Sequence, residues 1–568
     1  MSRGKTIVVL ILFLALSACG LLAGGAWLVL RQAQPGPSPS SGQAPADAPE
    51  TADGASAALD GRPASAPDAA RRGGSLTLPG SMPSTLDPAL VRDVGSAAYM
   101  YEIYSGLVTL SPELEVVPDL AERWEIGAGG TEYTFHLRGD ARFQDGSLVT
   151  ADALAFAIER GCDPATGSLV APVYLGDIVG CLEKLAGRRQ TVTGLRVPDA
   201  RTLVLTIDAP KAYFLAKLTY PTAFALDPLQ LESDPDWQAH PNGSGPFRLV
   251  ELIEDERAVL ERNPGYPGPG PWLDRVVFDL RPAASVTLYE NGELDATPVG
   301  LADIERVRDP LNPLSREVHE GAGELGLSYI AFDLRQPPFD DPHLRRALNY
   351  ALDKAKLAEV VMRGTVIPVY GILPPGMPGF DAALSPYRFD PALARQELAA
   401  SRYGGPAGLP PITLNTAGLG GEDPLAMAVA DELAEVLGID VALEQAPWET
   451  FQAELEAGAY PMYSLGWSAD YADPQDFLDV LFHGASSLNH GGYANPAVDA
   501  LLEAARVEAD PERRLARYAE AERAILEDAP WVPLFTGRET WLVAPYVRGF
   551  AIPPITLPRL QRVWIEAP

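Results

Sequence analysis

Hydrophobic and polar positions alternate at β-strand spacing through much of the chain up to about residue 330. Three such segments combine alternation with β-branched or aromatic residues: residues 74–78, 133–137 and 202–207. This is the pattern of strands with one buried face. Thr150 stands before an apolar-periodic run over residues 151–158, which predicts an N-capped amphipathic helix, and another helix is expected around residues 97–107. The first part of the chain is therefore predicted to be rich in strands, with helices between them.

After about residue 330 the pattern predicts longer helices, each beginning at the same kind of signal. An Asp or Asn is followed at once by Pro, so that the first residue caps the helix and Pro occupies the first turn. The pairs are Asp341-Pro342, Asp423-Pro424, Asn495-Pro496 and Asp510-Pro511. The first of these helices is expected to continue to about Met362. Strand-like segments at residues 412–414 and 441–444 alternate with the helices, which is typical of an α/β lobe.

A short segment at residues 459–474 combines a strand pattern with an unusual acidic residue. Tyr463, Leu465 and Trp467 alternate with small residues, which indicates a buried strand. Asp470 follows where the strand ends, beside two aromatic residues. A carboxylate in apolar surroundings is costly to desolvate unless a cation meets it, and the primary amine of a ligand would do so. The alternative is that Asp470 begins a turn or caps the helix after Pro474.

Length, composition and charge limit the class of protein. With 568 residues the chain exceeds what one hydrophobic core usually serves, so two or three lobes are expected. Hydrophobic residues make up 47% of the chain, which is enough for sizeable cores. The formal net charge is −32. Because nucleic-acid phosphates require a basic face, this charge argues against nucleic acid as a partner.

Residues 1–31 are interpreted as a targeting segment. Arg3 and Lys5 form a basic start before an apolar stretch, and residues 16–20 resemble a bacterial lipobox in which Cys19 is lipidated after cleavage. The alternative is an uncleaved membrane anchor, because apolar residues continue to Leu30 and residues 7–30 would span roughly 36 Å as a helix. Both interpretations attach the protein to the cell membrane with its folded part outside the cytoplasm, in the periplasm or on the cell surface.

The segment after the targeting region and the remaining cysteines agree with that compartment. Residues 32–72 are rich in Pro, Ala, Ser, Gly and Asp, which predicts a disordered linker. If Cys19 carries lipid, Cys162 and Cys181 remain as an even pair in an oxidising space, where a disulfide is expected. The alternative is two buried free thiols.

Motifs for covalent chemistry and for cofactors are missing or misplaced. Residues 321–326 match GxGxxG, but a strand-like stretch follows where a dinucleotide site needs a helix N-terminus. The sequence contains no phosphate loop of the GxxxxGK[ST] type, no HExxH zinc motif and no GxSxG elbow. His483 and His490 lie close to Asp470 in sequence, where solvent-facing loop histidines are the simpler expectation than pocket or metal-binding residues. We therefore expect no cofactor, no metal site and no enzymatic activity.

Several sequence blocks, in order along the chain, carry a resemblance to a known family. They are residues 84–88, 118–124, 133–138, 143–153, 243–247, 288–295, 345–353 and 466–474. From about Gly73 to about Gly549 the chain resembles the family 5 extracellular solute-binding proteins, which are the receptors of ABC importers. The segment at residues 466–474 resembles the aspartate-bearing motif of the peptide-binding members of that family, the oligopeptide and dipeptide binders.

The resemblance implies a fold and a division into lobes. The fold would be α/β, periplasmic-binding-protein-like type II (cluster C), with two α/β lobes that close on a ligand and an additional inserted β-rich lobe. The expected bounds are residues 73–113, 223–328 and 536–568 for lobe I, residues 114–222 for the inserted lobe, and residues 329–535 for lobe III. The two crossovers between lobes I and III are expected near residues 328–334 and 533–542. The protein is expected to be a monomer.

The resemblance also implies a function and a site. Asp470 would hold the α-ammonium of a peptide captured between the lobes, for delivery to ABC permease subunits with cytoplasmic ATPases. Gly466 and Ser468 are expected at the site, and the aromatic residues close to the motif, Trp448, Tyr463, Trp467, Tyr471 and Tyr493, are candidates for shaping side-chain pockets. The alternative for each of these aromatic residues is a place in the hydrophobic core. Family members that bind a nickel chelate, a sugar or another small solute share the scaffold, but Asp470 favours a ligand with an amine. An extracytoplasmic hydrolase is the alternative from another class, and no motif supports it.

Overall fold

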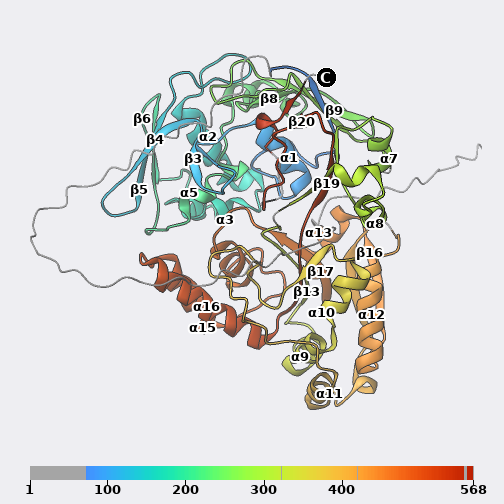
Figure 1. Cartoon of the computed structure of the whole chain (residues 1–568). Helices are drawn as coiled ribbons and strands as arrows, with labels where there is room; N and C mark the ends of the chain where they lie inside the picture. The colour runs from blue at the N-terminus through green and yellow to red at the C-terminus, as the bar shows by residue number, and fades with distance from the viewer. Residues whose placement is uncertain (1–71, 284, 322, 419, 556–558, 567–568) are drawn as a thin grey trace, which may run out of the picture.

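The computed structural model describes residues 72–568, apart from residues 284, 322, 419, 556–558 and 567–568 (Figure 1). The expected targeting segment, the linker and the lipidation of Cys19 lie outside the described residues, except for Arg72. Within the part of the chain that is described, no helix is both long enough and apolar enough to cross a membrane.

Lobe I, in the upper part of Figure 1, is assembled from distant parts of the chain. Its larger sheet has the order β1-β10-β9-β8, with β1 (Ser75–Pro79) parallel to β10 (Arg275–Asp279) and the others antiparallel. Its second sheet has the order β11-β19-β12. The remaining bounds are β9 Arg257–Arg262, β8 Phe247–Ile253, β11 Ala296–Pro298, β19 Thr540–Val543, β12 Val318–Glu320, β20 Val547–Arg548, β21 Trp564–Ile565, α1 Val94–Ile103, α6 Pro228–Ser233, α7 Ser285–Glu290 and α8 Ile304–Arg308. The main-chain N–H of Leu560 donates to Glu102 at the end of α1, which ties the last segment to the first.

The inserted lobe carries its own four-stranded sheet and hydrophobic core. The sheet has the order β4-β5-β7-β6, formed by Ala121–Ile126, Glu132–Leu137, Thr202–Thr206 and Leu195–Asp199. The helices α2 (Ala151–Gly161), α3 (Ala171–Tyr174), α4 (Cys181–Leu185) and α5 (Phe214–Lys217) belong to the same lobe. The expected boundary at residue 114 falls in the turn of the hairpin between β2 (Val108–Leu110) and β3 (Val116–Pro118).

A disulfide joins Cys162, directly after α2, to Cys181 at the start of α4. Both side chains are buried in the core of the inserted lobe. In the chain-entropy model a cross-link that closes a loop of this length stabilises the folded state by about 3 kcal/mol. We predict that the unfolded, unreduced protein, lacking residues 1–71, has no titratable thiol, and that reduction lowers the melting temperature. Two titratable thiols before reduction would contradict the disulfide.

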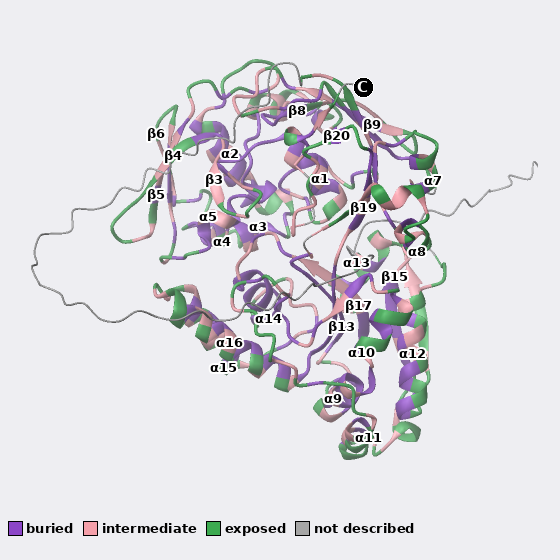
Figure 2. Ribbon diagram, viewed as in Figure 1, coloured by how far each residue is buried: buried purple, intermediate pink, exposed green. Residues whose placement is uncertain are grey.

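Lobe III contains a six-stranded mixed sheet covered by helices. The strand order is β14-β18-β13-β17-β15-β16, and the helices α11 and α12 present their exposed residues on the outside (Figure 2). The strands are β14 Val366–Pro368, β18 Trp531–Gly537, β13 Gly326–Phe332, β17 Met462–Ser468, β15 Ile412–Ala417 and β16 Val441–Ala446. The helices are α9 Pro342–Ala351, α10 Lys354–Lys356, η6 Leu357–Val361, α11 Pro391–Ala400, α12 Pro424–Leu437, α13 Trp448–Glu456, η8 Gln475–Asp479, α14 Val480–Phe482, α15 Pro496–Arg506 and α16 Pro511–Asp528. The central strands β13 and β18 are buried along their whole length.

The Asx-Pro signals start helices as the sequence predicts. In α9, α12, α15 and α16 the capping side chain accepts a hydrogen bond from a main-chain N–H of the first turn. The predicted continuation of the first helix to Met362 is wrong. Helix α9 ends at Ala351, and Asp353 caps a new short helix by accepting from the N–H of Lys356. The cap at Asp353 therefore starts a separate helix, although the apolar periodicity of the sequence continues beyond Ala351.

Two short crossovers connect lobe I with lobe III. One runs over residues 321–325, between β12 and β13, and the other over residues 538–539, between β18 and β19. The first crossover precedes the expected residues 328–334, because those residues form most of β13 itself. The second lies within the expected range. The GxGxxG match at residues 321–326 therefore leads into a strand.

Two described contacts join lobe III to the other lobes. Arg92 of lobe I forms an ion pair with Glu456 at the end of α13 in lobe III. Arg514 of lobe III lies 5.4 Å from the ring centroid of Tyr213 in the inserted lobe. The structure is therefore that of a protein whose lobes are closed on each other.

Candidate functional site

Asp470 lies two residues after the end of the strand β17, at the junction of the lobes. The strand pairs with β13 along its whole length, with Gly466 opposite Ser328 and Ser468 opposite Gly326. On its other edge the register with β15 joins Asn415 to Tyr463 only. Directly after the strand, the N–H of Ala469 donates to the carbonyl of Leu325 (2.7 Å). Asp470 follows and leaves lobe III toward the other lobes.

A tyrosine of the inserted lobe meets the Asp470 side chain. The hydroxyl of Tyr174, at the end of α3, donates to Oδ2 of Asp470 across 296 residues of sequence. The ring of Tyr174 is stacked on that of Tyr220, with centroids 3.7 Å apart and planes within 1°. The Tyr220 hydroxyl in turn donates to the carbonyl of Val91 (3.0 Å). Two fixed aromatic rings therefore stand opposite Asp470, on the far side of the interlobe junction.

The Asp470 carboxyl group is desolvated and has no described cation beside it to balance a negative charge. Burial raises the pKa of Asp470 to about 7, and the hydrogen bond from Tyr174 opposes the shift. Among the described residues no Lys, Arg or His forms an ion pair with Asp470, whose side chain is bonded to Tyr174. The pKa values of Tyr101 and Tyr220 are also raised, chiefly by burial, with the negative charge of Asp470 contributing. The site is therefore acidic and would be stabilised by a positive charge brought by a ligand.

A second carboxyl group, Asp476, lies directly behind the first. Its Oδ2 accepts hydrogen bonds from the main-chain N–H of Asp470 (3.1 Å) and from the indole Nε1–H of Trp467 (3.2 Å). Burial, together with the neighbouring Asp470 charge, raises the pKa of Asp476 well above its ordinary value. Sequence reasoning missed both Asp476 and Tyr174. Asp476 appears in the sequence as one more acid near a helix start, and nothing local connects Tyr174 to Asp470.

Two partly buried ion pairs fix the segment that follows Asp470. Asp473 forms a bidentate pair with Arg514 of α16, at 2.8 and 2.6 Å. Asp479 forms a second bidentate pair with Arg506 of α15, at 2.7 and 2.6 Å. Asp473 also accepts from the N–H of Gln475 at the start of η8. The backbone between Asp470 and α14 is therefore tied to two helices of lobe III.

The other sequence-predicted pocket residues divide into two groups. Trp467 and Tyr471 lie at the Asp470 turn, and Tyr471 packs into the hydrophobic core of lobe I. Gly466 and Ser468 belong to the strand that leads to it. Tyr463, Trp448 and Tyr493 lie elsewhere: Tyr463 is buried beside Asp333 and Arg335, Trp448 starts α13 against Phe451, and the Tyr493 hydroxyl donates to Asp528. Those three aromatic residues pack in lobe III, as strand and helix residues commonly do.

The two histidines near Asp470 in sequence do not both face solvent as expected. His483 is only 8% exposed, and its Nδ1 accepts from the N–H of Ala485. Burial lowers the pKa of His490 to about 4, with Arg335 and Arg92 adding to the effect. His490 is therefore neutral at physiological pH and does not supply the missing positive charge. No group of three or more metal-ligating side chains occurs in the described part of the chain.

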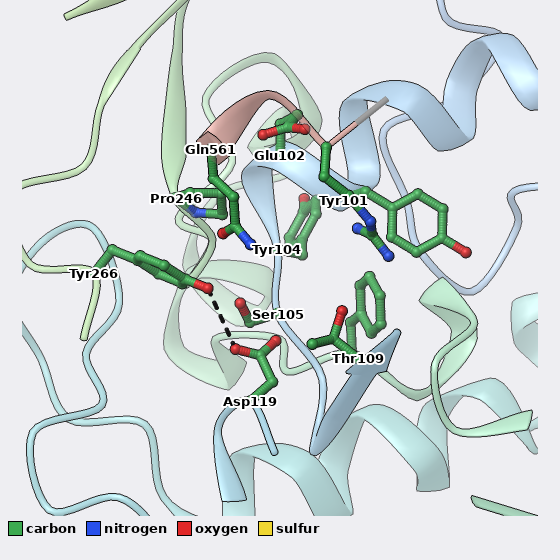
Figure 3. Close-up of a pocket in the computed structure, with 11 residues that line it drawn as sticks. Tyr101, Glu102, Tyr104, Ser105, Thr109, Asp119, Pro246, Tyr266 and Gln561 are labelled. Atoms are coloured by element: carbon green, nitrogen blue, oxygen red, sulfur yellow. Dashed lines mark hydrogen bonds between the residues drawn. The ribbon is translucent and has the colours of Figure 1, made fainter. Parts of the chain in front are cut away.

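A small cavity lies in lobe I behind Tyr101 (Figure 3). Its lining includes Glu102, Asp119 and Tyr266, and the Tyr266 hydroxyl lies 3.5 Å from Asp119. Burial raises the pKa of Glu102 to about 7 and that of Asp119 to about 6. With room for about 20 Å³, the cavity can hold one or two water molecules and no peptide. It belongs to the interior of lobe I and is not a ligand pocket.

The fold and the site together define a class. Two α/β lobes are joined by two short crossovers and close on an acidic group that lacks a cationic partner among the described residues. This arrangement is typical of a binding protein. The family model for bacterial extracellular solute-binding proteins, family 5 Middle, matches residues 115–489. The chain belongs to this family, whose members bind solutes and are not enzymes.

Individual relatives match most of the chain. The probable deoxycholate-binding periplasmic protein YgiS of Escherichia coli (strain K12) is 31% identical over 496 residues, covering 83% of this chain and 89% of the relative. The periplasmic oligopeptide-binding protein OppA of the same organism is 29% identical over 486 residues, covering 83% and 88%. These similarities and the lobes described above confirm the predicted family and fold.

Two solved structures of one relative bear on the state of the lobes. The Escherichia coli murein tripeptide binding protein MppA matches with a TM-score of 0.79 at 26% identity, covering 87% of this chain and 99% of that chain. Its unliganded open form matches with a TM-score of only 0.66 at the same identity, covering 86% and 97%. Together with the interlobe contacts, the lower score for the open form indicates that this structure is closed.

Proposed function

We propose that this protein is the peptide receptor of an ABC importer and that it holds the free N-terminal ammonium of its ligand at Asp470. The observation that carries the proposal is a half-buried carboxyl group at the junction of the lobes, whose side chain is bonded to a tyrosine hydroxyl and to no Lys, Arg or His among the described residues. A peptide ammonium supplies the positive charge and the hydrogen-bond donors that this carboxylate lacks.

Closure of the lobes on a bound peptide would remove water from Asp470 and from the peptide ammonium. In the open protein a peptide would bind to one face, and closure would then bring the Tyr174 hydroxyl beside Asp470 and the ammonium. The oxygen of this hydroxyl can accept a hydrogen bond from the ammonium while its proton is donated to Asp470. The outer edge of β17 at Gly466 and Trp467 has no paired strand among the described residues, and it can pair with the main chain of an extended ligand. Such pairing gives affinity without strong side-chain preference.

The relatives support a peptide more than an organic anion. OppA and MppA are named for peptides, whereas YgiS is named for deoxycholate, which carries a carboxylate. A carboxylate placed at Asp470 would face two acids, the half-buried Asp470 and the fully buried Asp476, with no described cation paired to either. A nickel chelate or a sugar would leave the Asp470 charge equally uncompensated.

The location and the partners complete the proposal. The receptor would act outside the cytoplasm, attached to the cell membrane through lipid on Cys19 or through an uncleaved N-terminal helix. It would deliver its peptide, as a monomer, to permease subunits in the membrane that are driven by cytoplasmic ATPases.

The proposal predicts a pH effect that depends on the ligand's amine. Binding of an ammonium requires an ionised Asp470, whose pKa in the ligand-free closed state is about 7. Lowering the pH from about 7.5 to 5.5 protonates this carboxyl and should weaken the affinity for a free-amine peptide on the order of tenfold. The N-acetylated form of the same peptide should bind weakly at both pH values. Isothermal titration calorimetry with a mixed peptide pool, and then with single peptides, measures both affinities.

Equal affinity for the free and acetylated forms at both pH values would contradict an ammonium site. Mass spectrometry of the small molecules that co-purify with the protein gives an independent measurement. Peptides with free N-termini support the proposal, and a bile acid, a sugar or a metal chelate contradicts it.

A further inference from the structure

Asp476 connects the strand β17 to the turn that carries Asp470. The side chain is completely buried, at 0% exposure, and lies in η8. Its Oδ2 accepts the main-chain N–H of Asp470 and the indole N–H of Trp467. Trp467 is part of β17, whereas Asp470 has already left the strand. One carboxyl oxygen therefore fixes the direction in which the chain leaves the sheet.

Stability alone does not account for a carboxyl group at this position. Asp473, Asp476 and Asp479 follow one another at intervals of three residues, and the first and third are each neutralised by an arginine. Among the described ion pairs none involves Asp476, and its Oδ1 has no hydrogen-bond partner. A buried oxygen that lacks a partner costs free energy, because it has lost its bonds to water. A carboxyl group at position 476 therefore lowers the stability of the fold. Its hydrogen bonds hold the turn at Asp470 in place.

We propose that Asp476 is a positioning residue of the ammonium site, which orients the Asp470 carboxyl toward the ligand through the Asp470 N–H and the Trp467 indole. This inference rests on the proposed function of Asp470. With both bonds in place, the peptide unit between Ala469 and Asp470 cannot rotate without breaking one of them. A charge-assisted hydrogen bond weakens steeply with misalignment. A looser turn would therefore lower the affinity for the free amine more than it lowered the stability of the fold.

The test compares two variants by their preference for a free amine. Asp476→Asn keeps an acceptor oxygen for both N–H groups, whereas Asp476→Ala removes it. The readout is the ratio of Kd values for the N-acetylated and free-amine forms of one peptide, measured by calorimetry at pH 7.5. Asp476→Ala should lower this ratio about tenfold, as expected for the loss of two hydrogen bonds. Asp476→Asn should keep the ratio within about threefold of the parent.

Asn349→Ala is the matched control. Asn349 is also completely buried in lobe III, and its side chain makes two hydrogen bonds to main-chain carbonyls of Arg345 and Trp531. Its loss should lower the melting temperature and leave the free-amine preference unchanged. If Asp476→Ala does not fold, Trp467→Phe removes one of the two donors and should lower the ratio by a few fold.

The outcomes separate this inference from the proposed function. A parent protein with no preference for the free amine overturns the ammonium site, and the inference with it. A parent with the preference, and Asp476→Ala with the same preference, overturns the positioning role and leaves the ammonium site intact. If Asp476→Asn loses the preference as fully as Asp476→Ala, the charge of Asp476 rather than its bonds is what matters, and the positioning role is wrong.

Discussion

Replacing Asp470 by alanine should weaken the binding of a free-amine peptide by roughly two to four decades. The variant would leave the ligand's ammonium buried between the lobes without a carboxylate, and breaking a buried ion pair in this way costs about 3–5 kcal/mol. The Tyr174 hydroxyl would remain, but it cannot compensate a full charge. Calorimetry with one defined peptide measures the loss.

A thermodynamic cycle identifies the contact that is lost. N-acetylation of the peptide should cost the parent protein a comparable affinity, and the two changes together should cost clearly less than their sum, because they remove the same pair. Asp431→Ala, which removes an exposed carboxylate of α12 in the same lobe, should leave the affinity unchanged. If Asp470→Ala binds the free-amine peptide within about threefold of the parent, Asp470 is only a turn residue.

Replacing Arg514 by methionine should cost about 3–5 kcal/mol of unfolding free energy. The Arg514 side chain is only 8% exposed and pairs with the carboxylate of Asp473, which would be left buried without a counter-charge. The guanidinium also lies over the ring of Tyr518, with 5.0 Å to the centroid. Urea denaturation of the ligand-free protein, followed by tryptophan fluorescence, measures the difference.

The neighbouring residue provides the control for this variant. Arg513 pairs with Glu508 at the surface, where its side chain is 69% exposed, so Arg513→Met should cost less than about 1 kcal/mol. Adding Asp473→Asn to Arg514→Met should recover part of the loss, because no unpaired charge then remains buried. Equal stability of the two single arginine variants would show that the Asp473–Arg514 pair does not stabilise the segment after Asp470.

Local patterns in the sequence predict those features of the structure that depend on residues close together in the chain. The Asx-Pro helix starts were predicted correctly because a capping side chain bonds to N–H groups two or three residues away. Asp470 was selected as a site hypothesis from its place at the end of an apolar strand, which is a local pattern, and from the family resemblance of the segment around it. Its partner Tyr174 was not, because the contact depends on how the inserted lobe is placed against lobe III. The pocket predictions for Tyr463 and Trp448 followed from proximity in sequence, which does not say on which side of a strand or helix a ring lies.

The three-stranded sheet of lobe I sets an order in which the protein can be completed. The strand β19 lies between β11 and β12 and pairs with both, although it follows them by more than two hundred residues of chain. The inserted lobe and most of lobe III can form while the chain is still being extended, since their sheets close within shorter stretches. Lobe I cannot be completed at that stage, because β19, the middle strand of its three-stranded sheet, is the last of these three strands in the chain. Until β19 is added, the half-built lobe would expose the edges of β11 and β12, which are open to pairing with another strand.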